Sequence, residues 1–241
     1  MSLNDIKDDI KIDLSNNLDK LKEECKEYLD DSEYVYKICS NCIVVMKKLQ
    51  DTRTNENRIN VANSLYAKFR ADKLYVVKII NSNNMELIKE VTNNNYYIKI
   101  TYKCDEIIVP DIFDENINEV CSSGIHYFKT IDAAFYYRDQ LPTQFTGKWV
   151  CWYGNGNGNK NYESRYIDGK KTGKWTRWYE NGNKSFEGEY INDKKTGKWT
   201  RWYENGNKSF EGEYINDEKI GNGFIGMKME TNMKKVNVLM A

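Results

Sequence analysis

The chain has 241 residues, with 36 basic and 36 acidic side chains, 40% apolar residues and 13% aromatic residues. A formal net charge of zero argues against a dedicated nucleic-acid-binding protein, and the aromatic content argues against a disordered chain. The longest uninterrupted apolar runs, such as residues 42–46, are far shorter than the roughly 20 residues of a membrane span. Residues 1–9 are polar and acidic, unlike a secretory signal. We therefore expect an intracellular protein with reduced thiols and no transmembrane segment.

The first segment, residues 1–32, carries apolar side chains at intervals of three and four residues. These are Leu14, Leu18, Leu21, Cys25 and Leu29. Charged side chains occupy the opposite face, so the spacing predicts an amphipathic helix over about residues 4–30. Such a stripe most often packs on its own domain, and the alternative is self-association through residues 4–30.

Residues 33–140 alternate short apolar runs with Asn-rich turns, which predicts a compact α+β domain. We expect strands at residues 42–46, 73–80, 86–91, 96–102, 106–109 and 125–128. Thr130 is placed to cap a helix over about residues 131–139. Residues 140–147 would form a short link to the C-terminal part of the chain.

This domain contains the residues that most resemble catalytic or metal-binding candidates. His126 is the only histidine, and it follows Cys121 by five residues, so the two form a conceivable thiol nucleophile and base. The alternative is that His126 is a hydrogen-bonded residue of a strand. Cys39 and Cys42 have the spacing of a zinc-ligand pair, but a zinc ribbon needs two such pairs. We therefore expect structural thiols and predict no catalytic residue, cofactor or metal ion.

The C-terminal part consists of repeats. Residues 170–193 and 194–217 are identical, residues 147–169 form a divergent earlier copy, and residues 218–228 form a degenerate one. A tail follows at 229–241. Within one unit we expect strands at 174–179 and 184–191, joined by a hairpin at Asn181-Gly182. Residues 192–197 would then turn the chain into the next unit.

The aromatic residues of each unit decide how the units assemble. A hairpin this short cannot bury them alone, so we predict a linear array in which neighbouring units stack. Trp175 and Trp178 are three residues apart, and in a regular strand they would face opposite sides of the sheet. Either both faces carry tryptophan, or a bulge redirects one of the two.

The repeat frame resembles a known motif. Phe-Glu-Gly-Glu-Tyr at 186–190, with Gly197, Trp199, Trp202 and Asn205-Gly206, is similar to the MORN (membrane occupation and recognition nexus) repeat, and closer to its MORN-variant form. The resemblance covers 147–217 in three copies and departs from the usual pattern by the extra tryptophan. The resemblance implies a fold in which an all-β array of stacked MORN-like hairpins follows the α+β domain.

The N-terminal half resembles domains in proteins of large DNA viruses of amoebae, such as mimivirus-like viruses. The segments that carry this resemblance are residues 41–49, 67–79, 109–114 and 121–128. In those viruses such a domain often precedes repeat arrays. The resemblance implies no particular activity.

We expect a non-enzymatic binding or scaffold protein that uses the repeat surface for protein–protein interaction. The expected contact residues, some of which must also form core, are Trp175, Arg177, Tyr179, Trp199, Arg201 and Tyr203. The sequence does not identify the partner.

Two alternatives remain at this point. In one, the pairs Lys170-Lys171 and Lys194-Lys195, which recur in the same expected turn, line a basic edge that binds anionic membranes. In the other, the N-terminal domain is an enzyme centred on Cys121 and His126.

Overall fold

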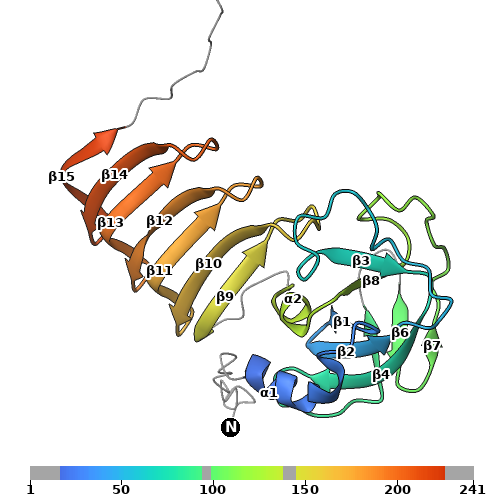
Figure 1. The fold of residues 1–241 in the computed structure, drawn as a ribbon. Helices are drawn as coiled ribbons and strands as arrows, with labels where there is room; N and C mark the ends of the chain where they lie inside the picture. Colours follow the sequence, from blue (N-terminus) through green and yellow to red (C-terminus); the bar gives the residue numbers. More distant parts are fainter. Residues whose placement is uncertain (1–16, 94–98, 138–144, 226–241) are drawn as a thin grey trace, which may run out of the picture.

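A computed structural model describes residues 17–93, 99–137 and 145–225. The described chain is mostly β, with antiparallel sheets built from hairpins (Figure 1). Six strands form one sheet, seven strands form a second, and β5 (Glu90–Asn93) pairs with β6 (Ile100–Lys103). Described residues include no helix long and apolar enough to cross a membrane.

The six-stranded sheet has the order β3-β8-β1-β2-β4-β7, and every neighbouring pair is antiparallel. Its strands are β1 (Tyr34–Cys39), β2 (Cys42–Lys47), β3 (Lys68–Ala71), β4 (Leu74–Asn81), β7 (Ile107–Ile108) and β8 (Ile125–Phe128). Both faces are covered. Ile43 and Val45 of β2 point into a cluster with the helices, while Val44 and Met46 point into a second cluster with Phe69. This is why residues 42–46 are apolar without alternation.

Two short helices cover the first cluster. Helix α1 spans Asn17–Glu24 and α2 spans Ile131–Tyr136, and Thr130 caps α2 by accepting a hydrogen bond from the amide of Ala133 at 3.2 Å. The predicted helix over 4–30 is wrong after Glu24, where the chain tightens into a single 3-10 turn, Lys26–Tyr28. Its residues 1–16 lie outside the described chain. Leu18, Leu21 and Cys25 are buried in the chain's own core, which favours packing over self-association.

The predicted strands of this region are largely confirmed, with some differences. Strands β1 and β3 were not predicted, and of the predicted strand at 86–91 only Glu90 and Val91 lie in a strand, β5. For the predicted strand at 96–102, residues 96–98 lie outside the described part, and β6 begins at Ile100. The predicted helix 131–139 ends at Tyr136, and most of the predicted link at 140–147 is not described.

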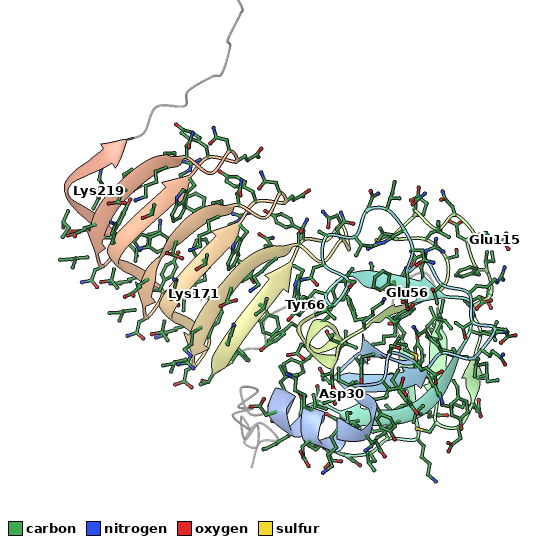
Figure 2. The ribbon with its side chains drawn as sticks, in the orientation of Figure 1. Asp30, Glu56, Tyr66, Glu115, Lys171 and Lys219 are labelled. Carbon is green, nitrogen blue, oxygen red and sulfur yellow. The ribbon has the colours of Figure 1, made fainter. Side chains whose placement is uncertain are left out.

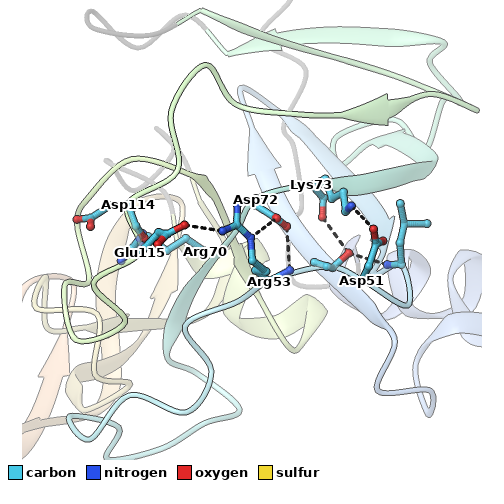
Figure 3. Close-up of polar contacts among 9 residues, drawn as sticks. Asp51, Arg53, Arg70, Asp72, Lys73, Asp114 and Glu115 are labelled. Carbon is cyan, nitrogen blue, oxygen red and sulfur yellow. Dashed lines mark hydrogen bonds and ion pairs between the residues drawn. The ribbon is translucent and has the colours of Figure 1, made fainter.

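Arg70 organises the loop that precedes β8. Its side chain is fully buried, and its guanidinium donates to the backbone carbonyls of Asp114, Asn116, Glu119 and Ser123 at 2.5–3.0 Å. Figure 3 shows how Arg53, beside it, bridges Asp72 and Glu115 at 2.8 and 2.6 Å. A buried cation is tolerated here because four carbonyl dipoles replace its hydration.

The seven-stranded sheet is an antiparallel meander in chain order, β9 to β15. Its strands are β9 (Gly147–Trp152), β10 (Lys160–Ile167), β11 (Lys170–Trp178), β12 (Lys184–Ile191), β13 (Lys194–Trp202), β14 (Lys208–Ile215) and β15 (Glu218–Ile225). The predicted turn at 192–197 is wrong. The turn is only Asn192-Asp193, both with positive φ, and β13 begins at Lys194. Residues 226–228 of the degenerate copy and the tail at 229–241 lie outside the described chain.

Hydrogen bonds between successive turns join the units at both ends of the strands. At one end, Tyr153 and Tyr179 donate their hydroxyls to the carbonyls of Trp178 and Trp202, at 2.7 and 2.9 Å. At the other end, the carboxylate of Asp193 accepts from the amide of Lys171 at 2.8 Å. Each hairpin of the meander therefore satisfies polar groups of the next one.

The first hairpin of this sheet docks on the loop that leads into β3. Its turn carries Gly156, whose carbonyl accepts from Arg58 Nη2 at 2.6 Å, and Gly158, where a Cβ would lie 2.2 Å from the Asn63 carbonyl oxygen. Tyr66, labelled in Figure 2, stacks on Trp152 with ring centroids 5.1 Å apart. Docking explains why this turn is longer and richer in glycine than the later ones.

Tryptophan packs on glycine at the centre of the array. Gly188 of β12 lies under the Trp199 indole, and a Cβ at Gly188 would lie 2.3 Å from its Cδ2 and Cε2 atoms. Trp199 is consequently only 4% exposed. One unit later, Gly223 stands where Trp199 would recur, and the Phe210 ring covers Gly212 instead.

We expect Gly188→Ala to destabilise the protein by about 1–3 kcal/mol, because the added methyl overlaps the Trp199 ring. Gly154→Ala is the matched control, since neither glycine has a positive φ and nothing lies within 4 Å of a Cβ at Gly154. Urea unfolding of both variants measures the difference. Equal stabilities of the two variants would contradict the packing described for Trp199.

Candidate binding face of the seven-stranded sheet

One face of the seven-stranded sheet carries a row in which aromatic rings and arginines alternate. Cross-strand pairing runs from Tyr162 to Arg177, Phe186, Arg201 and Phe210, so the row crosses β10 to β14 at right angles to the strands. The Arg201 guanidinium lies over the Phe186 ring at 5.2 Å from its centroid. Arg177 and Arg201 are both exposed. We call this side of the sheet the cationic face.

A second row on the cationic face alternates tyrosine and lysine. Lys171 lies over the Tyr190 ring at 5.2 Å, and Lys195 lies over Tyr214 at 5.5 Å and over Trp199 at 4.8 Å. Lys219 lies over Phe210 at 4.9 Å. Figure 2 shows Lys171 and Lys219 on this array, far apart along it.

Between the two rows lies the core of the array. Trp175 and Trp199 have ring centroids 5.8 Å apart, and the Tyr190 ring meets both edge-on at 6.1 and 5.1 Å. Such edge-to-face pairs are favourable beyond their burial. The central row therefore holds the units together, and the outer rows present charge.

The five cations of the cationic face, Lys171, Arg177, Lys195, Arg201 and Lys219, form no ion pair with a described residue. Two acidic side chains at the edge, Asp193 and Asp217, accept hydrogen bonds from the backbone amides of Lys171 and Lys195. Burial and the charges of Asp217 and Asp193 raise the pKa of Tyr190 in the second row, so these carboxylates partly offset the lysines there. Arg177 and Arg201 have no ion pair with a described residue.

The opposite face is different. There Glu187 pairs with Lys174 and Lys184 at 3.1 and 2.6 Å, and Glu211 pairs with Lys198 and Lys208 at 2.6 and 2.7 Å. Glu163 repeats the arrangement with Lys148 and Lys160. These ion pairs and their hydrogen bonds lower the pKa of Glu187 against the opposing effect of burial. Acidic and basic groups therefore face one another on this side.

Grooves recur on the cationic face at the repeat period. One, of about 470 Å³, includes Phe186, Lys195, Trp199 and Arg201 in its lining. Another, of about 350 Å³, includes the residues 24 positions earlier, which are Tyr162, Lys171, Trp175 and Arg177. Equivalent positions of successive units therefore line similar concave sites, with Tyr162 of the divergent copy where the next unit has Phe186.

The predicted contact residues do not all lie on one surface. Trp175, Arg177 and Arg201 lie on the cationic face with Lys171 and Lys195, and Tyr203 lines the larger groove. Trp199 is only 4% exposed but lines the larger groove, and the Tyr179 hydroxyl donates to the Trp202 carbonyl, so for both residues the contact role stays a prediction.

Lys170 and Lys194 lie elsewhere. They pair across strands with Ile167 and Ile191 on the opposite face. The prediction that the four lysines lie in turns and line one basic edge is therefore wrong. The cause is the two-residue turn, which places consecutive lysines at the start of a strand, where side chains alternate between faces.

Sequence reasoning missed Phe186, Phe210 and Lys219 as members of this face. Their position follows from cross-strand register, which includes bulges between Arg177 and Trp178 and between Arg201 and Trp202. Trp178 and Trp202 lie on the opposite face, where Lys160 and Lys184 cover their rings at 5.0 and 5.9 Å. Each tryptophan pair therefore places one ring on each face of the sheet, which is the first of the two possibilities left open by the sequence.

The structure does not join Cys121 to His126 by a hydrogen bond among the described residues. Instead Lys68 Nζ lies 3.2 Å from Cys121 Sγ and 3.2 Å from the Tyr137 hydroxyl. The Nε2 atom of His126 is buried and has no hydrogen-bond partner in the described chain. Burial lowers the pKa of His126 to about 3, and Lys68, Lys37 and Arg70 act in the same direction. A neutral imidazole of this kind is a weak base.

Cys39 and Cys42 flank the tight turn between β1 and β2, where they pair across the hairpin and are both buried. Burial raises the pKa of Cys39 to about 11. Both side chains belong to an apolar cluster with Val44 and Met46, so they act as small apolar core residues.

Comparison with known families gives a match in the N-terminal part of the chain. Residues 23–134 match the model of a family described as a family of unknown function (DUF5758). The matched segment begins within α1 and ends within α2, before the seven-stranded sheet. No match to a curated protein was found.

We expect acid to destabilise the protein through His126. The folded pKa is about 3 and the ordinary value is 6.5, so below pH 6.5 the unfolded chain binds a proton that the folded chain does not. Stability falls by about 1–2 kcal/mol between pH 6.5 and 5, a range above the ordinary pKa values of the carboxylates.

Chemical denaturation across this range tests the effect, and His126→Gln is the control that removes it. The readout is the slope, so a uniform loss of stability in the variant does not interfere. The burial assigned to His126 is contradicted by a wild-type stability that stays flat, or by a slope that persists in the variant.

Proposed function

We propose that the chain is a non-enzymatic binding protein, in which an α+β N-terminal domain carries a MORN-like repeat array that docks an acidic polypeptide. The observation that supports this most directly is the contrast between the two faces of the array. One face holds five cations without an ion pair to the described residues, and the other alternates lysine and glutamate. The N-terminal half resembles domains in proteins of large DNA viruses of amoebae, and we therefore propose a viral origin for the chain. This resemblance implies no activity.

The chemistry of the cationic face suits carboxylates. An arginine lying over an aromatic ring keeps its charge and its in-plane N–H donors, which match a carboxylate in geometry. Aromatic rings beside it supply rigid contact area at little entropic cost. An acidic segment placed along the rows would gain both kinds of contact. On the opposite face, by contrast, Lys174 and Lys184 already pair with Glu187, and Lys198 and Lys208 with Glu211.

We expect a fluorescein-labelled glutamate-rich peptide to bind the full chain, with an affinity that falls as salt rises. Arg177→Ala with Arg201→Ala should weaken binding about tenfold, or roughly 1.4 kcal/mol, because two exposed charge contacts are lost. Fluorescence anisotropy measures both. Lys170→Ala with Lys194→Ala removes the same charge from the opposite face and should leave the affinity unchanged. Equal losses in the two double variants would refute docking on the cationic face.

A second function is favoured by a row of exposed isoleucines. Ile167, Ile191 and Ile215 are 52%, 58% and 54% exposed, and each follows its predecessor by 24 residues. They lie on the opposite face, and the first two pair across strands with Lys170 and Lys194. Apolar side chains next to lysines suit the surface of an anionic membrane.

If this second function holds, the protein sediments with phosphatidylserine vesicles at low salt. Lys170→Glu with Lys194→Glu should then reduce the bound fraction severalfold, because each charge near the surface contributes about 1 kcal/mol. Arg177→Ala with Arg201→Ala is the control that leaves sedimentation unchanged. An unaltered bound fraction in the Lys→Glu variant would eliminate membrane association through these lysines.

A further inference from the structure

The spacing of the charged rows restricts what can bind them. This inference rests on the proposed docking of an acidic polypeptide, and it names the conformation and the sequence period of that polypeptide. The rows run across the strands, so a ligand that follows them runs along the array and not parallel to a strand. Each unit contributes two strands, so equivalent cations recur about every 9.5 Å.

Three regular conformations of a peptide can be compared with this period. A β-strand returns to the same face every two residues, or about 6.6 Å, so its side chains could meet equivalent cations only at every second unit. An α-helix returns after two turns, about 10.8 Å, and so drifts by more than 1 Å per unit. A polyproline II helix returns every three residues, about 9.3 Å, and stays in register over several units.

The grooves also suit this conformation. Phe186, Trp199 and Phe210 line one groove, and Tyr162 and Trp175 line the groove one unit earlier. Aromatic-lined grooves are the usual receptors of polyproline II segments, whose prolines pack between the rings. The conformation is largely formed before binding, so little entropy is lost on docking.

We infer that the cationic face binds an acidic segment in the polyproline II conformation, with a carboxylate at every third residue. One carboxylate meets Arg177 and the carboxylate three residues along meets Arg201. The two residues between them pack against the rings of the grooves. Lys171, Lys195 and Lys219 repeat at the same interval and flank the other edge of the segment.

The test compares two labelled 15-residue peptides of the same composition against the full chain. One is five repeats of Glu-Pro-Pro, and the other holds five glutamates and ten prolines in an order that breaks the three-residue period. Both favour polyproline II and carry equal charge, so only the register differs. We expect the periodic peptide to bind at least tenfold more tightly. Arg177→Ala with Arg201→Ala should remove most of that advantage, and Lys170→Ala with Lys194→Ala should preserve it.

Each other outcome is decisive. Equal affinities for the two peptides overturn the inference about period and leave acidic docking standing. A peptide with the same glutamate spacing but glycine in place of each proline carries equal charge and disfavours polyproline II; if it binds as tightly as the periodic peptide, the inference about conformation is overturned. If no acidic peptide binds, the inference and the proposed docking both fall, and sedimentation with phosphatidylserine vesicles would then favour the membrane function.

Discussion

The array depends on one contact, the packing of a tryptophan ring on a glycine of the neighbouring strand. Trp199 lies over Gly188, and the absence of a Cβ there lets a large ring approach the backbone closely enough to be only 4% exposed. A sheet made of short hairpins has little other means of removing aromatic surface from water. Gly188 therefore determines where Trp199 lies, and Trp199 in turn packs against the rings of Trp175 and Tyr190.

Because of the same contact, residues that stabilise the array and residues that are free to bind a ligand occupy different rows of one face. Because the central row is filled by tryptophan, the residues on either side of it can be polar without opening the core. Arginine and lysine occupy those sides and lie over Phe186, Tyr190 and Tyr214. A repeat built in this way extends its stability and its charged surface together each time a unit is added. That property is well suited to a ligand that is itself periodic.

Much of the fold can be predicted from local sequence signals. The apolar run at 42–46, the Thr130 cap and the Asn-Gly hairpins all predict the elements that the structure shows, because each depends on neighbours in the chain. The two-residue turn at Asn192-Asp193 is not predicted in this way, because residues 192–197 are all polar or glycine and resemble one continuous loop. Two consecutive residues with positive φ reverse the chain instead, with the twist that paired strands require.

The binding face is only half predictable. Arg177 and Arg201 stand out in the repeat, but their alternation with Phe186 and Phe210 depends on register and bulges between strands, which sequence spacing does not encode. Likewise, nothing local marks Arg70 as buried. Its four carbonyl partners come from a loop more than 40 residues away.

The most direct measurement of the central claim is a two-dimensional ¹H–¹⁵N spectrum of the six tryptophan indoles during titration with the periodic acidic peptide. The two faces carry different tryptophans, so the protein contains its own control. The account predicts that the indole signal of Trp175 shifts, while those of Trp178 and Trp202 stay in place. Shifts confined to Trp178 and Trp202 would place the ligand on the opposite face and contradict the account.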